Sequence, residues 1–231
     1  MSQVPPAKRH PYDQWSPDAR ALDLVGDKWT LLIVRDLMSG PRRFVELQRV
    51  LPGISTEQLR SRLNRMVADG MLTRQRYREV PPRVDYELTQ RARDLAPVLG
   101  ELARWGYEWA WGSPRPSEHI DVGAIFRLLP GLLHPGDVPA GAILLTTVDG
   151  GSSHHALLSI AAPAVMLSEP AEPPAADASL SGTVDAWVRA LGPGADTSGL
   201  QAEGRVDLRE AVLEQLSLGD SGREALASAA S

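Results

Sequence analysis

The chain has 231 residues, a hydrophobic share of 43% that is normal for a globular protein, and a formal net charge of −5. It contains no cysteine, which excludes disulfides, thiolate metal sites and thiol-based switches. No run of residues is apolar enough to span a bilayer, and the first residues lack a signal-peptide pattern. We therefore expect a cytoplasmic protein that contacts no membrane.

The charge is divided unevenly along the chain. Residues 1–116 hold 19 Lys and Arg against 14 Asp and Glu, a charge of +5, whereas residues 117–231 hold 5 against 15, a charge of −10. This division favours two domains with different partners. The basic half is suited to a polyanion, and the acidic half is not.

Four helices are predicted in the first seventy residues. Ser16-Pro17 is a cap followed by proline at the first helical position, and that helix ends at Gly26. The second helix runs from Lys28 to Ser39 behind the cap Asp27, and the third from Arg43 to Val50. After a turn containing Pro52 and Gly53, a fourth helix covers 55–70, so the order is helix, turn, longer helix.

The fourth helix has two contrasting faces. Ser55 and Gln58 form a capping box, and Gly70 follows the last turn. Its apolar face carries Leu59, Leu63, Met66 and Val67, and its opposite face carries Glu57, Gln58, Ser61, Asn64 and Arg65 with Arg60 and Arg62 on the shoulders. Such a polar face suits DNA base edges and phosphates, but a solvated amphipathic helix is the simpler interpretation when the helix is taken alone.

Period-two patterns follow the fourth helix. Residues 71–78 read as a strand with Arg74, Arg76 and Arg78 on one side, and residues 83–88 return as its hairpin partner. Arginine stems can cover apolar surface while their charges face water. Beside a polar helix we favour contacts with phosphates.

A long helix is predicted from Gln90 to about Trp111, with Pro97 able to kink or restart it. Its apolar stripe is wider than one small domain needs and is formed by Leu95, Val98, Leu99, Leu102, Trp105 and Trp109. The stripe fits contact with a second subunit or packing against the C-terminal half about equally well.

Residues 16–106 resemble the HxlR family of winged-helix transcription regulators. The motifs that carry the resemblance occur in order along the sequence: 21–30 (ALDLVGDKWT), 35–37 (RDL), 40–44 (GPRRF), 51–55 (LPGIS), 79–84 (EVPPRV) and 86–89 (YELT). The family implies a bacterial homodimer joined through outer helices, with a recognition helix in the major groove and a wing at the flanking backbone. By position, the resemblance puts Ser55, Thr56, Gln58, Ser61, Arg62 and Arg65 at the groove, and Arg76, Arg78 and Arg83 on the wing.

This sequence departs from the family pattern at one position. Many relatives carry a cysteine just before the proline that starts the first helix, and some use it to sense oxidants or electrophiles. Ser16 occupies that position here. Because a hydroxyl forms neither a thiolate at neutral pH nor a disulfide, direct thiol sensing is excluded.

The C-terminal half is predicted to be α+β, with an antiparallel-rich sheet and helices on one side. A helix is expected over 122–133, strands over 142–148, 155–160, 165–167 and 178–182, helices over 184–191 and 207–216, and a last short strand over 200–204. The predicted organisation is an arm (1–15), a winged helix-turn-helix and dimerisation domain (16–112), a linker (113–119), this α+β domain (120–219) and a tail (220–231).

Residues 120–219 resemble a sterol-carrier-type domain, and the distinctive match is 178–191 (ASLSGTVDAWVRAL). That resemblance implies a cavity between sheet and helices for a small apolar or lipid-like ligand, with candidate contacts Phe126, Leu129, Leu145, Leu158, Trp187 and Leu191. The alternative is a filled core that serves as a dimer or interaction module.

The sequence therefore predicts a DNA-binding transcription regulator, by family default a repressor, that binds operator DNA as a homodimer. The C-terminal domain would sense a ligand or organise the dimer. The rival interpretation is a lipid carrier or protein-interaction module whose helix-turn-helix is only scaffold. We expect no enzyme, cofactor or metal site, since no G-x-S-x-G, Gly-rich phosphate loop or H-E-x-x-H motif occurs.

Overall fold

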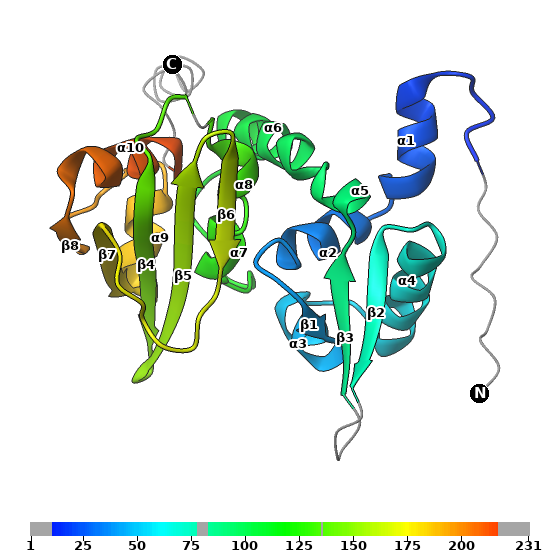
Figure 1. Ribbon diagram of the computed structural model, residues 1–231, viewed down its shortest axis with the longest axis horizontal. Helices are drawn as coiled ribbons and strands as arrows, with labels where there is room; N and C mark the ends of the chain where they lie inside the picture. Colours follow the sequence, from blue (N-terminus) through cyan, green and yellow to red (C-terminus); the bar gives the residue numbers. More distant parts are fainter. Residues whose placement is uncertain (1–10, 78–82, 135, 217–231) are drawn as a thin grey trace. The chain divides into compact units, whose positions relative to one another are not determined.

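The computed structural model describes residues 11–77, 83–134 and 136–216 and divides the chain into two compact units (Figure 1). The N-terminal unit extends to Leu95, and the C-terminal unit begins at Ala96. The limits predicted from sequence, including the linker at 113–119, stay predictions. Within the described residues, no helix is both long and apolar enough to cross a bilayer.

The N-terminal unit consists of helices and a three-stranded antiparallel sheet with strand order β1-β3-β2. Its helices are α1 (Pro17–Val25), α2 (Thr30–Asp36), α3 (Phe44–Val50), α4 (Thr56–Ala68) and α5 (Gln90–Arg93), and its strands are β1 (Arg42–Arg43), β2 (Leu72–Tyr77) and β3 (Arg83–Leu88). The four predicted helices and the hairpin are confirmed, and β1 was not predicted. Pairing of Arg42 with Tyr86 attaches β1 to the middle strand β3.

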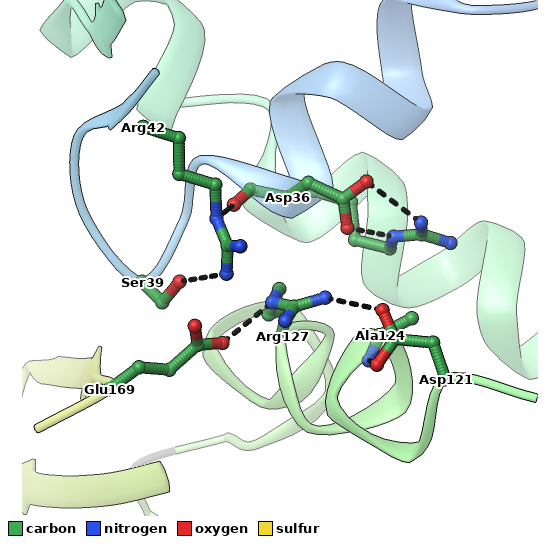
Figure 2. A network of polar contacts seen from close by, with 8 residues as sticks. Asp36, Ser39, Arg42, Asp121, Ala124, Arg127 and Glu169 are labelled. Atoms are coloured by element: carbon green, nitrogen blue, oxygen red, sulfur yellow. Dashed lines mark hydrogen bonds and ion pairs between the residues drawn. The ribbon is translucent and has the colours of Figure 1, made fainter. Parts of the chain in front are cut away.

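Polar contacts inside the N-terminal unit fix the chain that leads into β1. Arg35 forms two hydrogen bonds with the buried carboxylate of Asp36, both at 3.0 Å. Arg42 donates from Nε to the Asp36 carbonyl oxygen at 2.7 Å and from Nη2 to Ser39 Oγ (Figure 2). Gly40 lies between these partners at a φ of +133°, a backbone conformation that favours glycine. The bonds from Arg42 help to hold this turn from α2 to β1.

The C-terminal unit is an α+β fold with a five-stranded sheet of order β6-β5-β4-β7-β8, in which the pair β4–β7 is parallel and the other pairs are antiparallel. Helices α7 to α10 lie on one side of this sheet (Figure 1). Its elements are α6 (Ala96–Trp109), α7 (Val122–Phe126), α8 (Leu129–Leu132), β4 (Gly141–Asp149), β5 (Ser152–Ala161), β6 (Ala164–Ser168), β7 (Ala178–Thr183), α9 (Val184–Leu191), β8 (Gln201–Gly204) and α10 (Val206–Leu216).

Two predicted helices are each interrupted close to a proline. The long helix from residue 90 divides into α5 and α6, and Pro97 is the second residue of α6, so the predicted restart at that proline is confirmed. The single helix expected over 122–133 is wrong, because it divides into α7 and α8. Pro130 has no N–H for the carbonyl of Phe126, and its ring would clash with that carbonyl in a continuous helix.

A buried ion cluster fixes the start of the C-terminal fold. The guanidinium of Arg127 lies between two carboxylates, with Nη1 at 3.0 Å from Asp121 and Nε at 2.6 Å from Glu169 (Figure 2). Asp121 also caps α7 by accepting the N–H of Ala124 at 3.2 Å. Since Arg127 is buried, this pairing offsets the cost of removing its charge from water.

Candidate nucleic-acid interface

Helix α4 is fixed at both ends by contacts that its sequence encodes. Ser55 Oγ accepts the N–H of Gln58, and Gln58 Oε1 accepts the N–H of Ser55, both at 3.1 Å. Gly70 follows the helix at a φ of +69°, a conformation that glycine adopts without a Cβ clash. Leu59, Leu63 and Met66 are buried on the inner face. The helix is therefore anchored by its apolar face and its caps.

The predicted groove residues differ in what their side chains already do. Ser61 is exposed and Arg65 is partly exposed. Ser55 and Gln58 are engaged in the capping box, which leaves the Gln58 amide NH₂ as a donor that the capping bond does not use. Thr56 is exposed, and its Oγ1 accepts a hydrogen bond from Gln48 Nε2 at 2.7 Å. Because that bond occupies an acceptor position, the Thr56 hydroxyl remains a donor.

Arg62 is turned toward the protein rather than outward. Its Nη1 lies 3.0 Å from Asp27 Oδ2, and the side chains of the two residues are 29% and 25% exposed. The helical spacing explains this direction, because Arg62 adjoins the buried Leu59 and Leu63 on one shoulder of α4. The sequence motif put Arg62 at the groove, whereas the structure gives it an intramolecular partner.

The predicted wing arginines also differ in whether their side chains already contact other residues of the protein. Arg76 is exposed on β2. Arg83 donates from Nε to both carboxylate oxygens of the buried Asp85, at 2.8 and 2.9 Å, and its guanidinium lies over the Tyr77 ring at 5.4 Å. Arg74, which the hairpin pattern placed beside Arg76, lies over the Tyr86 ring at 5.9 Å. Arg78 lies outside the described residues.

Sequence reasoning missed Gln48 and Asp85 as partners of predicted site residues, and it assigned Asp27 only a capping role. A pattern of residue types along the chain contains no signal for the Gln48–Thr56 and Asp27–Arg62 contacts, because they join different helices. Asp85 and Tyr86 are neighbours on β3, so a period-two pattern that buries Tyr86 predicts an exposed Asp85. In the structure both residues are buried.

The two units carry net charges of opposite sign. Residues 1–95 carry 17 of the 24 basic and 12 of the 29 acidic residues, a net charge of +5, and residues 96–231 carry the other 7 and 17, a net charge of −10. The exposed polar face of α4 therefore belongs to the basic unit. A unit of this charge attracts polyanions.

The six predicted ligand contacts of the C-terminal unit lie together in its hydrophobic core. Phe126 and Trp187 meet edge to face at 4.8 Å between ring centroids, and the indole Nε1 of Trp187 donates to the carbonyl oxygen of Thr146 at 2.9 Å. The set comprises Phe126, Leu129, Leu145, Leu158, Trp187 and Leu191, each at most 2% exposed. These contacts are those of packed core side chains.

Helix α6 has one buried and one exposed face. Its inner face crosses α8 so closely that the two backbones are in contact. A Cβ added to Gly100 would lie 2.0 Å from the carbonyl oxygen of Gly131. Tyr107 packs there against Leu132, and burial raises the pKa of Tyr107 to about 12. The outer face exposes four large apolar side chains: Val98 (49%), Leu102 (51%), Trp105 (58%) and Trp109 (65%).

Comparisons with known proteins agree on the N-terminal region. The family model described as HxlR-like helix-turn-helix matches residues 24–113. The uncharacterized HTH-type transcriptional regulator sll1512 of Synechocystis sp. is 41% identical over 93 residues, which cover 40% of this chain and 69% of that protein. The corresponding regulator YvaP of Bacillus subtilis is 38% identical over 90 residues, 39% of this chain and 83% of YvaP.

A solved structure, the reduced form of the transcriptional regulator YodB from B. subtilis, is 33% identical with a TM-score of 0.38 and covers 42% of this chain and 96% of YodB. The two sequence relatives are matched over more than two thirds of their own length. Helices α2, α3 and α4 lie inside the residues that the family model matches. The chain belongs to the HxlR-like helix-turn-helix family.

Proposed function

We propose that this protein is a sequence-specific DNA-binding transcription regulator that binds a two-fold symmetric operator as a homodimer. The observation that carries the proposal is the exposed polar face of α4, held by a buried apolar face and a capping box on the basic unit. The relatives, which bear the name of HTH-type transcriptional regulators, support it.

In this proposal the outward residues of α4 contact different parts of the DNA. Ser61 and Arg65 contact base edges or phosphates in the major groove. Thr56, at the first turn of the helix, donates a hydrogen bond from its hydroxyl to a phosphate near the helix N-terminus, where backbone N–H groups also favour an anion. Arg76 and Arg78 contact the flanking backbone from the predicted wing, and there they position the protein rather than read sequence. Arg83, which pairs with Asp85, acts mainly on the stability of the wing.

Homodimerisation is proposed to use the outer face of α6. Val98, Leu102, Trp105 and Trp109 follow at intervals of three or four residues, so they form one continuous stripe. A stripe of this kind marks a protein interface more often than a solvated surface. A two-fold symmetric operator requires that the two copies of α4 lie about one turn of DNA apart.

For the C-terminal unit we favour the dimer-organising role over ligand sensing. The backbone crossing of Gly100 with Gly131 attaches α6 to this unit. Arg104 strengthens the attachment by donating from Nη2 to the carbonyl oxygen of Leu132, and Trp111 Nε1 donates to that of Leu191 at 2.9 Å. The core position of the six predicted ligand contacts also supports this choice. The resemblance of residues 120–219 to a sterol-carrier-type domain stays a prediction.

Repression is the regulatory sign that we propose, because a dimer bound across a promoter excludes polymerase without further contacts. A reporter gene downstream of an operator-containing promoter tests the sign. Expression of the regulator should lower reporter output, and a rise would identify an activator instead.

The central test is selection of duplexes from a random DNA pool by the full chain. We expect enrichment of an inverted repeat whose half-site centres lie about 10 base pairs apart. Arg65→Ala should then bind the selected duplex about tenfold more weakly. Arg189→Ala is the control, since it removes the same charge from the exposed surface of α9 in the C-terminal unit and should bind like the wild type. Failure of the full chain to enrich any duplex would refute the proposal.

A further inference from the structure

The carboxylate of Asp27 joins the start of α2 to the middle of α4. Its Oδ1 accepts the backbone N–H groups of Trp29 and Thr30 at 2.9 and 3.1 Å. Its Oδ2 accepts the hydroxyl of Thr30 and lies 3.0 Å from Nη1 of Arg62. Four donors from three residues therefore converge on one carboxylate.

The anchor at the α2 end of this contact is rigid. Trp29 and Thr30 are buried, and the three bonds that they donate fix the orientation of the carboxylate. A negative charge at a helix N-terminus is also favoured by the aligned peptide dipoles. Arg62 consequently meets a carboxylate that cannot rotate to follow it.

This contact constrains α4 in a way that its apolar face does not. Leu59, Leu63 and Met66 hold the helix against the core, but apolar contacts have little directional preference and tolerate small rotations about the helix axis. A charged hydrogen bond at 3.0 Å depends on direction. Ser61 immediately precedes Arg62 and Arg65 follows it by less than one turn, so the rotation that Arg62 sets is the rotation of the outward face.

We propose that Asp27 and Arg62 are positioning residues for DNA recognition, with Asp27 holding α4 through Arg62 at the rotation that the groove requires. The inference rests on the proposed function and deepens it by assigning Arg62 to orientation instead of to a DNA contact. Asp27 already neutralises the guanidinium, so Arg62 releases few counterions on binding and contributes little to the salt dependence of affinity.

Two substitutions separate positioning from direct contact. Asp27→Asn keeps a side-chain oxygen for the N–H groups at the start of α2 but removes the charge that holds Arg62. Arg62→Met keeps an apolar stem of similar length and removes the charge. Removing the acidic Asp27 should strengthen DNA binding if charge alone mattered, because it lessens repulsion of phosphates. Positioning predicts the opposite sign.

The experiment measures affinity against salt concentration for the full chain and a duplex that the wild type selects from random DNA. We expect Asp27→Asn and Arg62→Met each to weaken binding about tenfold with an unchanged salt slope. The double variant should be no weaker than either single variant, because both remove the same interaction. Arg62→Lys should restore most of the affinity, and Arg65→Met is the comparison that should reduce the slope by about one unit.

The contradicting results are equally specific. An Arg62→Met slope lower by about one unit, together with wild-type affinity for Asp27→Asn, would make Arg62 a phosphate contact and overturn the inference. Additive losses in the double variant would also overturn it. Thermal unfolding of each variant gives a temperature at which all are folded, and Arg62→Lys keeps the test open if Arg62→Met unfolds. The wild type alone tests the proposed function, since its failure to select any duplex would remove both claims.

Discussion

The two units place their predicted functional residues in opposite surroundings. In the N-terminal unit, the outward residues of α4 are polar and exposed or partly exposed, and an apolar face beneath them explains why the helix stays in place. In the C-terminal unit, the six predicted ligand contacts are apolar and form the core itself. Ser61 is exposed on α4, whereas Trp187 and Leu145 are fully buried and contribute to the packing of the core.

Exposed and buried residues therefore carry different information about function. The polar face of a capped amphipathic helix suits solvent as well as a partner, so what points to DNA is its place in a basic helix-turn-helix unit. A buried apolar side chain at a sheet or helix position is accounted for by the core alone. Substitutions in the two units test this contrast.

Two tryptophans of the C-terminal unit, one buried and one exposed, provide the strongest test. Trp187→Ala should lower the free energy of unfolding by about 3–5 kcal/mol, because it removes a fully buried indole and its hydrogen bond to Thr146. Trp105→Ala, at a side chain 58% exposed, should change the unfolding of the monomer by less than about 1 kcal/mol. Denaturant unfolding measured at a concentration where the protein is monomeric checks both. A Trp187→Ala variant as stable as the wild type would favour a cavity over a filled core.

Two glycines of α6 test the attachment of that helix to the C-terminal unit. Gly100→Ala should cost about 1–3 kcal/mol, because the new Cβ would meet the backbone of Gly131 at 2.0 Å. At Gly106 a Cβ meets nothing within 4 Å, so Gly106→Ala should stabilise the helix by up to about 1 kcal/mol. Thermal unfolding compares the two, and equal effects would mean that the α6–α8 crossing does not constrain α6.

The outer face of α6 should govern association. Leu102→Glu should raise the dimer dissociation constant by at least about tenfold, because a charge would be buried in an apolar contact. Glu101→Gln, at the neighbouring exposed position, is the control and should leave the dimer intact. Analytical ultracentrifugation measures both constants. Dimerisation that survives Leu102→Glu would place the subunit contact elsewhere.

The wing arginines should give the smallest effects and should differ from one another. Arg76→Ala should reduce the salt slope of DNA binding by about one unit, because Arg76 is exposed on β2. Arg83→Ala should act mainly on stability, because it removes a charged partner from the buried Asp85. Binding at several salt concentrations, combined with thermal unfolding, distinguishes them. The reverse assignment of slope and stability would show that the pairing seen here does not persist on DNA.

Local chemistry made part of this structure predictable. The bounds of α4 follow from Ser55, Gln58 and Gly70, and those of α9 follow from Thr183 and the break at Gly192-Pro193-Gly194. The restart at Pro97 was predicted for the same kind of reason. The split between α7 and α8 was missed because the apolar spacing of Ile125, Phe126, Leu129 and Leu132 outweighed the signal of a single Pro130.

What could not be predicted depends on contacts between distant residues. Arg62 and Asp27 are far apart in sequence, and nothing in either segment encodes their meeting. Strand β1 has only two residues and exists because Arg42 and Arg43 pair with β3. The candidate site was therefore predictable as a face of one helix, whereas the roles of its individual arginines required the tertiary structure.

The most direct test of the account is a crystal structure of the full chain with the duplex that it selects. The account predicts α4 in the major groove, with Ser61 and Arg65 facing DNA and Arg62 still within hydrogen-bonding distance of Asp27. A complex in which the outward face of α4 is covered by protein or turned away from DNA would contradict it.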